Sequence, residues 1–255
     1  MENLVLLGEE RRKLELSSLE EDALIVDVVP VDDSDGGYVV LTQNGTVAKL
    51  AVDNSIQWTC SLKEESSDWF SVFWNDPEVV CLSKQGAIVT IDAASGEYEV
   101  IGVFDQGLDD AAWSSDGETM AMVTSIEDDE PTAPSETINS RLMTMNTQFE
   151  VLAEVTIPRH SSEHPVSLAW RPDSTLLAVS SVDEEDGVRK IRIYRRETLE
   201  LHAIGRAEDA SGTLVKNLQP STIAWAGAGC SQLLAGVQRK GKKTHQVVFF
   251  EPNGL

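Results

Sequence analysis

Short apolar runs alternate with clusters of Gly, Asp, Asn, Pro and Ser along almost the whole chain. Within a run, apolar residues tend to recur at every second position, which is typical of β-strands and not of helices. The segment "GYVVLTQNGTV" (37–47) shows the pattern well, because two such runs flank Asn44-Gly45. That residue pair favours a type I′ hairpin. The pattern therefore predicts an all-β protein.

One arrangement of residues recurs four times: a small or apolar approach, a tryptophan, a polar turn and a second apolar run. The four copies are "SVFWNDPEVVCLS" (71–83), "DAAWSSDGETMAMVTS" (110–125), "SLAWRPDSTLLAVSS" (167–181) and "TIAWAGAGCSQLLAGVQ" (222–238). Their tryptophans are Trp74, Trp113, Trp170 and Trp225. A tryptophan beside the turn is bulky enough to fill the space between neighbouring sheets, so we expect these four side chains to be structural.

A second recurring element supports the first. Alternating strands that run into a polar turn are found at 48–55, 88–97, 142–150, 191–200 and 247–255, and a fourth strand follows in the first four cases. Four strands per unit, repeated every ~45 residues, are typical of a WD-repeat-type β-propeller, in which stacked blades bury one another's faces. We predict five blades at about 23–62, 70–104, 108–157, 165–205 and 220–255, with an acidic loop at 125–140.

The fifth blade lacks its outer strand, and the sequence leaves two interpretations open. The segment "NLVLLG" (3–8) can supply that strand and close a five-bladed ring, or the ring has more blades and the chain is an incomplete N-terminal propeller domain spanning 1–255.

Composition limits the partners. The formal net charge is −23 and the sequence pI is near 4.4, which argues against binding nucleic acid or an anionic membrane over a broad face. Cys60, Cys81 and Cys230 are far apart and odd in number, as expected for reduced thiols and not for a disulfide framework or a zinc site. No segment reaches the ~18 apolar residues of a membrane span. We therefore expect a soluble intracellular protein.

The later repeats resemble a known family in their residues as well as in their spacing. The segments that carry the likeness are "AAWSSDGETMAMVTS" (111–125), "AWRPDSTLLAVSS" (169–181), "GVRKIRIYRRETLEL" (187–201) and "VVFFEPNGL" (247–255). They resemble the first propeller of the scaffold subunit of Elongator, the IKAP family, strongly from 105 onward and loosely over 10–100. One departure is "WAGAG" (225–229), where the family tends to keep a basic-proline turn.

The resemblance implies a non-catalytic scaffold in the Elongator complex, which supports carboxymethyl-type modification of wobble uridine in tRNA. It implies partners among the other subunits, including a catalytic iron–sulfur subunit and a WD-repeat subunit, and tRNA only through the assembly. The full-length family member is expected to be homodimeric, without membrane contact, in the cytoplasm and also in the nucleus. On this interpretation the chain is an N-terminal fragment of a much longer protein.

Motifs for catalysis or metal binding are weak. His160 and His164 have the i, i+4 spacing of zinc ligands on a helix, but Pro158 and Pro165 bracket them in a loop. The segment "VDDSDGG" (31–37) fails as a calcium loop, because its first ligand position is Val31. The segment "GAGCSQ" (227–232) lacks the third glycine of a dinucleotide loop and is followed by a strand. We therefore predict no catalytic residue, metal site or cofactor.

Two basic clusters interrupt the acidic background. In "VRKIRIYRRE" (188–197), alternation places Lys190, Arg192, Tyr194 and Arg196 on one side of a strand, with isoleucines on the other. "QRKGKK" (238–243) is a basic hairpin tip of the next blade. Together they form a candidate partner-binding edge consisting of Arg189, Lys190, Arg192, Arg196, Arg239, Lys240, Lys242 and Lys243.

This edge sustains an alternative function, a free-standing WD-type adaptor that binds an acidic protein or peptide. The competing interpretation is an ordinary solvated strand face on which long charged side chains prevent unwanted pairing. A third hypothesis, a propeller hydrolase, has no acid or histidine that the sequence singles out.

Overall fold

The computed structural model describes residues 3–7, 10–14, 24–32, 36–124, 140–158, 166–183, 187–206, 223–225, 234–240 and 244–250, and every helix or strand element among them is a β-strand. For 3–14, 206 and 234–250 the description covers the backbone alone. The chain divides into two compact units, Met1–Gly107 and Leu108–Leu255. The predicted all-β class is therefore confirmed.

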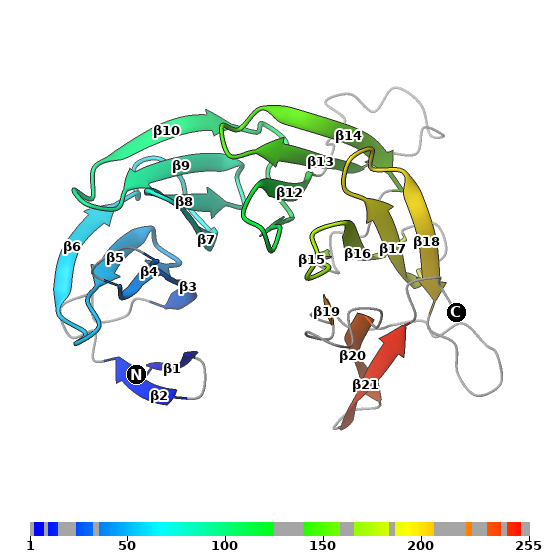
Figure 1. Ribbon diagram of the computed structural model, residues 1–255, viewed down its shortest axis with the longest axis horizontal. Coiled ribbons are helices and arrows are strands. Elements are labelled where there is room, and N and C mark those ends of the chain that lie inside the picture. The colour runs from blue at the N-terminus through cyan, green and yellow to red at the C-terminus, as the bar shows by residue number, and fades with distance from the viewer. Residues whose placement is uncertain are drawn as a thin grey trace. The chain divides into compact units, whose positions relative to one another are not determined.

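The first unit contains a hairpin and two four-stranded antiparallel sheets (Figure 1). The hairpin pairs β1 (Asn3–Leu7) with β2 (Glu10–Leu14), so the segment considered for completing the fifth blade pairs with its neighbour in sequence. The first sheet consists of β3 (Ile25–Pro30), β4 (Tyr38–Thr42), β5 (Thr46–Leu50) and β6 (Ile56–Ser61). The second sheet consists of β7 (Trp69–Asn75), β8 (Glu78–Ser83), β9 (Ala87–Asp92) and β10 (Tyr98–Val103).

The described residues of the second unit form three more sheets, in which each strand again pairs with its neighbour in sequence. The third sheet consists of β11 (Asp110–Trp113), β12 (Thr119–Thr124), β13 (Ser140–Asn146) and β14 (Val151–Ile157). The fourth consists of β15 (Ser167–Trp170), β16 (Leu176–Val182), β17 (Arg189–Arg195) and β18 (Leu201–Arg206). The fifth has three strands among the described residues, β19 (Ile223–Trp225), β20 (Leu234–Lys240) and β21 (Thr244–Phe250).

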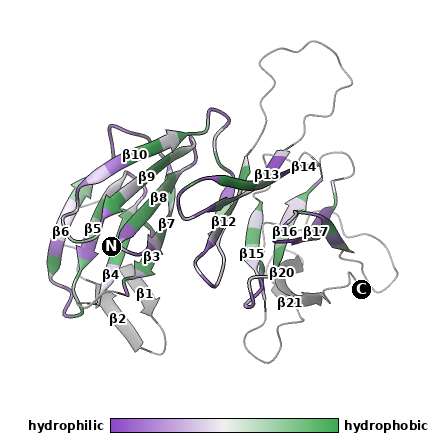
Figure 2. Ribbon diagram, turned by 45° about the horizontal axis from the view of Figure 1, so that its top comes forward, coloured by the Kyte–Doolittle hydropathy of each residue, from purple (hydrophilic) through white to green (hydrophobic). Residues whose placement is uncertain are grey.

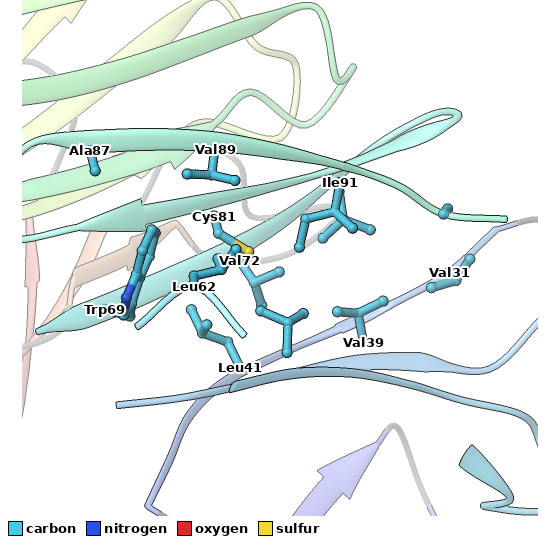
Figure 3. Packing of buried hydrophobic residues seen from close by; sticks show 13 residues of the cluster. Val31, Val39, Leu41, Leu62, Trp69, Val72, Cys81, Ala87, Val89 and Ile91 are labelled. Carbon is cyan, nitrogen blue, oxygen red and sulfur yellow. The ribbon is translucent and has the colours of Figure 1, made fainter. Parts of the chain in front are cut away.

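The core of the first unit lies between its two sheets. Leu41 and Val47 of the first sheet pack in one buried cluster with Val72, Cys81 and Val89 of the second (Figure 3). These residues alternate along their strands, so each strand contributes every second side chain to the cluster. The packing explains why neither sheet would be stable alone, since each covers an apolar face of the other.

The middle strands of the fourth sheet are buried on both faces. Leu177 and Tyr194 pack in a cluster with residues of the third sheet, whereas Leu176 and Ile193 pack with Trp225 of the fifth. Hydropathy drawn on the ribbon shows the same pattern in another sheet, because the middle strand β8 is largely hydrophobic (Figure 2). A strand covered on both faces has no solvated side, in contrast to a strand of a single-faced sheet.

The β4–β5 hairpin differs from its prediction. Gly45 has φ of +83°, but Asn44 is not among the residues with positive φ, so the turn is not type I′. The loop has three residues between Thr42 and Thr46, and the Gly45 N–H donates to the Thr42 carbonyl at 3.0 Å. A Cβ at Gly45 would lie 2.6 Å from Nε1 of Trp69, so this position requires glycine for space as well as for conformation.

Candidate partner-binding site

Two of the predicted tryptophans, Trp170 and Trp225, hold neighbouring sheets of the second unit together. Nε1 of Trp170 donates to the carbonyl of Ala112 at 2.9 Å, and Nε1 of Trp225 donates to the carbonyl of Ala169 at 3.0 Å. Each acceptor directly precedes the tryptophan of the sheet before, so the bond repeats from sheet to sheet. Trp74 is half-buried against the core of the first unit, and Trp113 is half-buried on β11.

A tryptophan outside the predicted set does the same in the first unit. Nε1 of Trp58, on the outer strand β6, donates to the Ala93 carbonyl of the second sheet at 2.9 Å, and Nζ of Lys49 donates to the same oxygen at 3.1 Å. Gly96 lies against the indole of Trp58, where a Cβ would approach ring carbon Cδ2 to 2.9 Å. Sequence reasoning missed Trp58 because no polar turn of the repeat directly follows it.

An aspartate near the start of the innermost strand forms another repeated contact. Oδ2 of Asp27 accepts the Val72 N–H at 2.9 Å and the Ser71 hydroxyl at 3.0 Å, which joins the first sheet to the second. Oδ2 of Asp110 accepts the Leu168 N–H at 2.7 Å, which joins the third sheet to the fourth. Backbone N–H groups of one strand are thereby satisfied by a side chain of the neighbouring sheet.

Two of the basic residues of β17 lie inside the fold, whereas Arg195 at its end is exposed. Arg189 and Arg192 are only 3% and 5% exposed. Nη1 of Arg189 donates to the Ser180 hydroxyl at 2.9 Å, and burial lowers the pKa of Arg189 to about 10. Nη2 of Arg192 contacts both carboxylate oxygens of Asp183, at 2.8 and 2.7 Å, and Nζ of Lys190 contacts Oδ2 of Asp183 at 2.5 Å. Asp183 is the carboxylate around which this cluster forms.

The alternation predicted for this strand agrees with the structure, but the prediction that one of its faces is exposed to solvent does not. Ile191 and Ile193 face the fifth sheet and Tyr194 packs on the side of the third, so two faces exist as expected. Both are covered, because β17 is the third strand of four and neighbouring sheets flank it. Arg189 and Arg192 are therefore not available to a partner, which corrects the expected exposed edge at these two positions. Burial raises the pKa of Tyr194 to about 12.

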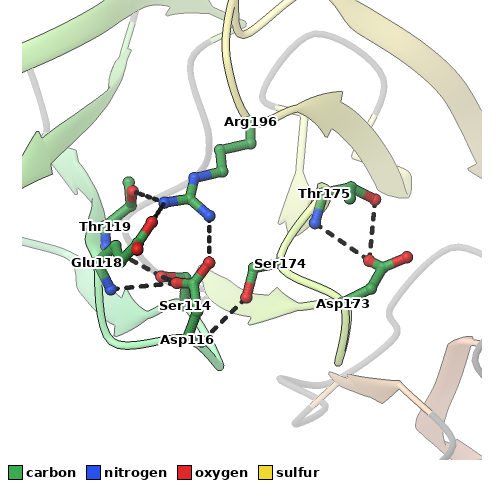
Figure 4. Close-up of polar contacts among 8 residues, drawn as sticks. All are labelled: Ser114, Asp116, Glu118, Thr119, Asp173, Ser174, Thr175 and Arg196. Carbon is green, nitrogen blue, oxygen red and sulfur yellow. Dashed lines mark hydrogen bonds and ion pairs between the residues drawn. The ribbon is translucent and has the colours of Figure 1, made fainter.

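Arg196 connects the fourth sheet to the third. Its guanidinium pairs with Asp116, donates to Oγ1 of Thr119 at 2.7 Å and reaches Oε2 of Glu118 at 3.1 Å (Figure 4). The Asp116 N–H also donates to Oγ of Ser174 at 3.1 Å. Burial alone would raise the pKa of Asp116. Hydrogen bonds from the Ser114 hydroxyl, the Glu118 N–H and Arg196 outweigh it and lower that pKa to about 2.

The turn after β15 contains a second ion pair. Nε and Nη2 of Arg171 contact the two carboxylate oxygens of Asp173 at 2.7 and 2.5 Å, and this guanidinium is the leading cause that lowers the pKa of Asp173 to about 2. Cζ of Arg171 lies 5.9 Å from the centre of the Trp225 ring. Arg171 and Asp173 border an open depression of about 990 Å³, which is also lined by Arg195, Arg196, Glu197, Glu200 and His202. Both signs of charge are present there.

For several predicted positions the structure describes no side chain. Arg239 and Lys240 belong to β20, for which only the backbone is described, and Lys242 and Lys243 lie outside the described residues. The same holds for the loop with His160 and His164, for 33–35 and for 227–232. Among the described residues, no group of three or more His, Cys, Asp or Glu side chains is placed to hold a metal ion. In the same residues no helix has the length and hydropathy to span a membrane.

Comparison with known families identifies the repeat. Residues 1–165 and 159–255 match the family described as "ELP1 first N-terminal beta-propeller". The chain belongs to this family.

Elongator complex protein 1 sequences are similar over most of the chain. The protein of Oryctolagus cuniculus is 28% identical over 207 residues, covering 71% of this chain and 15% of that protein. The protein of Schizosaccharomyces pombe is 24% identical over 253 residues, covering 84% of this chain and 19% of that protein. The chain thus spans less than a fifth of the length of these relatives.

Solved structures of propellers are similar in fold. The WD40 domain of Toxoplasma gondii coronin aligns with a TM-score of 0.60 at 13% identity, over 90% of this chain and 56% of that one. A chain in the complex of KlAtg21 with the coiled-coil of AgAtg16 aligns with a TM-score of 0.59 at 12% identity, over 88% and 65%. With the family match, these alignments confirm the predicted WD-repeat-type β-propeller fold.

Proposed function

We propose that this chain is a non-catalytic propeller of an Elongator scaffold subunit and supports carboxymethyl-type modification of the wobble uridine in tRNA. The observation that carries the proposal is the family match, which extends across the whole chain. The radical chemistry of that modification belongs to a separate iron–sulfur subunit. The task of this chain is to present rigid surfaces to that subunit and to a WD-repeat subunit.

The use of charged side chains supports a scaffold. Arg192 and Asp183 are buried against each other, and Arg196 and Asp116 join two sheets. An active site would need a polar group placed for a substrate, whereas these groups are engaged by their own neighbours. The proposal places tRNA contact in the assembled complex, because the charge of −23 repels a polyanion. Homodimerisation through the rest of the protein, and residence in the cytoplasm and the nucleus, follow from the same family assignment.

The structure gives less support to the adaptor hypothesis. It depended on exposed cations that would bind an acidic partner, and two of those cations, Arg189 and Arg192, are buried.

The nucleosides of tRNA test the proposal. The gene that encodes this chain is deleted in its own cells, and hydrolysed tRNA is analysed by liquid chromatography and mass spectrometry. We expect carboxymethyl-type wobble uridines to be lost and then restored by the wild-type gene. Unchanged levels of these nucleosides in the deletion strain would reject the proposal.

A further inference from the structure

The outer strand of the second sheet exposes apolar side chains that the fold does not use. On β10, Tyr98, Val100, Ile101 and Val103 are 39%, 38%, 41% and 59% exposed. This apolar stretch is also visible on the hydropathy ribbon (Figure 2). Among the described residues β10 pairs only with β9, so its other edge is open. We call this surface the β10 edge.

A β-bulge increases the apolar area of the β10 edge. Val100 pairs with Val89 and Gly102 pairs with Ile88, so Ile101 is the extra residue of the bulge. Two consecutive apolar side chains, Val100 and Ile101, are consequently exposed. A Cβ at Gly102 would meet no atom within 4 Å, which shows open space beside the backbone at this point.

The corresponding strand of the first sheet lacks these features. On β6 the exposed positions are Gln57, Thr59 and Ser61, and the apolar residues between them are half-buried. Polar outward positions are the usual protection of an edge strand against unwanted pairing. Lysine is a common protective residue, yet the sequence has no Lys or Arg between Lys84 and Arg141. The β10 edge therefore presents apolar side chains at outward positions, in contrast to β6 in the same unit.

Acidic residues surround the β10 edge. Glu97, Glu99 and Asp105 are exposed on β10 or beside it. Glu65 is exposed as well, and its Oε1 accepts the hydroxyl of Tyr98 at 2.9 Å. A second copy of this chain would bring like charges together, and an anionic lipid surface would be repelled. An apolar centre inside an acidic rim fits a positively charged partner.

We propose that the β10 edge binds an extended, basic segment of a partner protein as an added fifth strand of the second sheet. The backbone of the segment pairs with β10, its apolar side chains cover Val100, Ile101 and Val103, and its Lys or Arg side chains lie against Glu97, Glu99 and Asp105. Strand addition to an exposed sheet edge is a recurrent mode of peptide recognition. The proposal stands on the geometry of this strand and does not depend on the assembly in which the chain works.

Two labelled peptides of the same length as β10 test the proposal. One alternates Lys with Val and the other alternates Glu with Val, and fluorescence anisotropy measures the binding of each to the complete chain. We expect the Lys peptide to bind at least about tenfold more tightly than the Glu peptide, because only the first complements the rim. Failure of the Lys peptide to bind, or equal binding of both peptides, overturns the proposal.

Two double variants place the binding on β10. Ile101→Lys with Val103→Lys removes apolar contacts and adds two positive charges, so we expect it to weaken the Lys peptide by about tenfold or more. Gln57→Lys with Thr59→Lys adds the same charge on β6, and we expect less than about a threefold effect, because only the long-range field changes. Equal losses in both variants contradict the proposal. Self-association of the wild-type chain that the first variant abolishes, measured by sedimentation velocity, also contradicts it in favour of a second copy.

Discussion

The substitution Trp170→Phe removes the indole N–H that binds the Ala112 carbonyl and preserves most of the aromatic ring. It therefore separates the hydrogen bond between two sheets from the apolar packing of the same side chain. Trp170 is 7% exposed, so the ring that remains stays buried in the cluster shared by the third and fourth sheets.

The expected loss has two parts. A hydrogen bond between protein groups contributes about 0.5–1.5 kcal/mol, with a further cost if the acceptor is left without a donor. The smaller ring forfeits roughly 1 kcal/mol of buried area. We therefore expect Trp170→Phe to lower the free energy of unfolding by about 2 kcal/mol, of which about half reports the bond.

Trp74→Phe is the matched control. Trp74 is also packed against a core, but the structure gives its indole N–H no hydrogen bond among the described residues. Its substitution should cost about 1 kcal/mol or less, the packing contribution alone. Trp58→Phe should lie between the two, since Lys49 continues to donate to the Ala93 carbonyl.

Urea unfolding of the complete chain, followed by far-ultraviolet circular dichroism, measures all three variants without depending on tryptophan fluorescence. Equal slopes are required for the midpoints to be compared as stabilities. If Trp170→Phe costs no more than Trp74→Phe, the repeated indole bond does not stabilise the contact between sheets, and this reasoning is refuted.

Further substitutions test three other contacts. Asp183→Ala leaves Arg192 buried without its carboxylate, so we expect a loss of about 3–5 kcal/mol in urea unfolding, against a smaller loss in Asp183→Asn. Asp116 has a lowered pKa, so its contribution to stability is present above the ordinary pKa of 3.8 and disappears as pH falls toward 2. Asp116→Asn should therefore flatten the acid-unfolding curve between pH 4 and 2, by a modest amount because the side chain is 35% exposed. Gly45→Ala should destabilise the chain by more than about 1 kcal/mol, because its φ is +83° and Trp69 blocks the Cβ, whereas Gly102→Ala should be within about 0.5 kcal/mol of wild type.

Each of these has a contradicting result. Equal losses in the alanine and asparagine variants at position 183 would mean that the charge of the pair is irrelevant. If the acid-unfolding curve of Asp116→Asn matches that of the wild type between pH 4 and 2, the Arg196 contacts do not stabilise the chain through the Asp116 carboxylate. Equal losses of stability in Gly45→Ala and Gly102→Ala would show that crowding against Trp69 does not destabilise the chain.

The order of strands was predictable because the repeat is periodic in both apolar alternation and turn residues. "SLAW" and "IRIY" became strands β15 and β17, since β-branched and aromatic residues fit a pleated surface covered by neighbours. The prediction of a type I′ turn at Asn44-Gly45 was wrong, because the loop between β4 and β5 has three residues and not two. The third loop residue and the proximity of Trp69 decide its conformation.

The exposure of the candidate partner-binding edge was harder to predict than the order of strands, because it depends on how neighbouring sheets pack. Alternation indicates that a strand has two faces but not which of them a neighbouring sheet covers. The sequence predicts Arg192 to be a solvated cation, whereas in the fold its guanidinium contacts Asp183, nine residues earlier. Trp58 was missed because its partner Ala93 belongs to the next sheet. Only the folded arrangement brings such residues together.

The proposed function places this chain inside Elongator as part of its scaffold. Affinity purification of the tagged protein that carries the chain, at its natural level, followed by quantitative mass spectrometry, tests it most directly. The account predicts that the iron–sulfur catalytic subunit is recovered in an amount comparable to the tagged protein. Recovery of the tagged protein without any other Elongator subunit would contradict it.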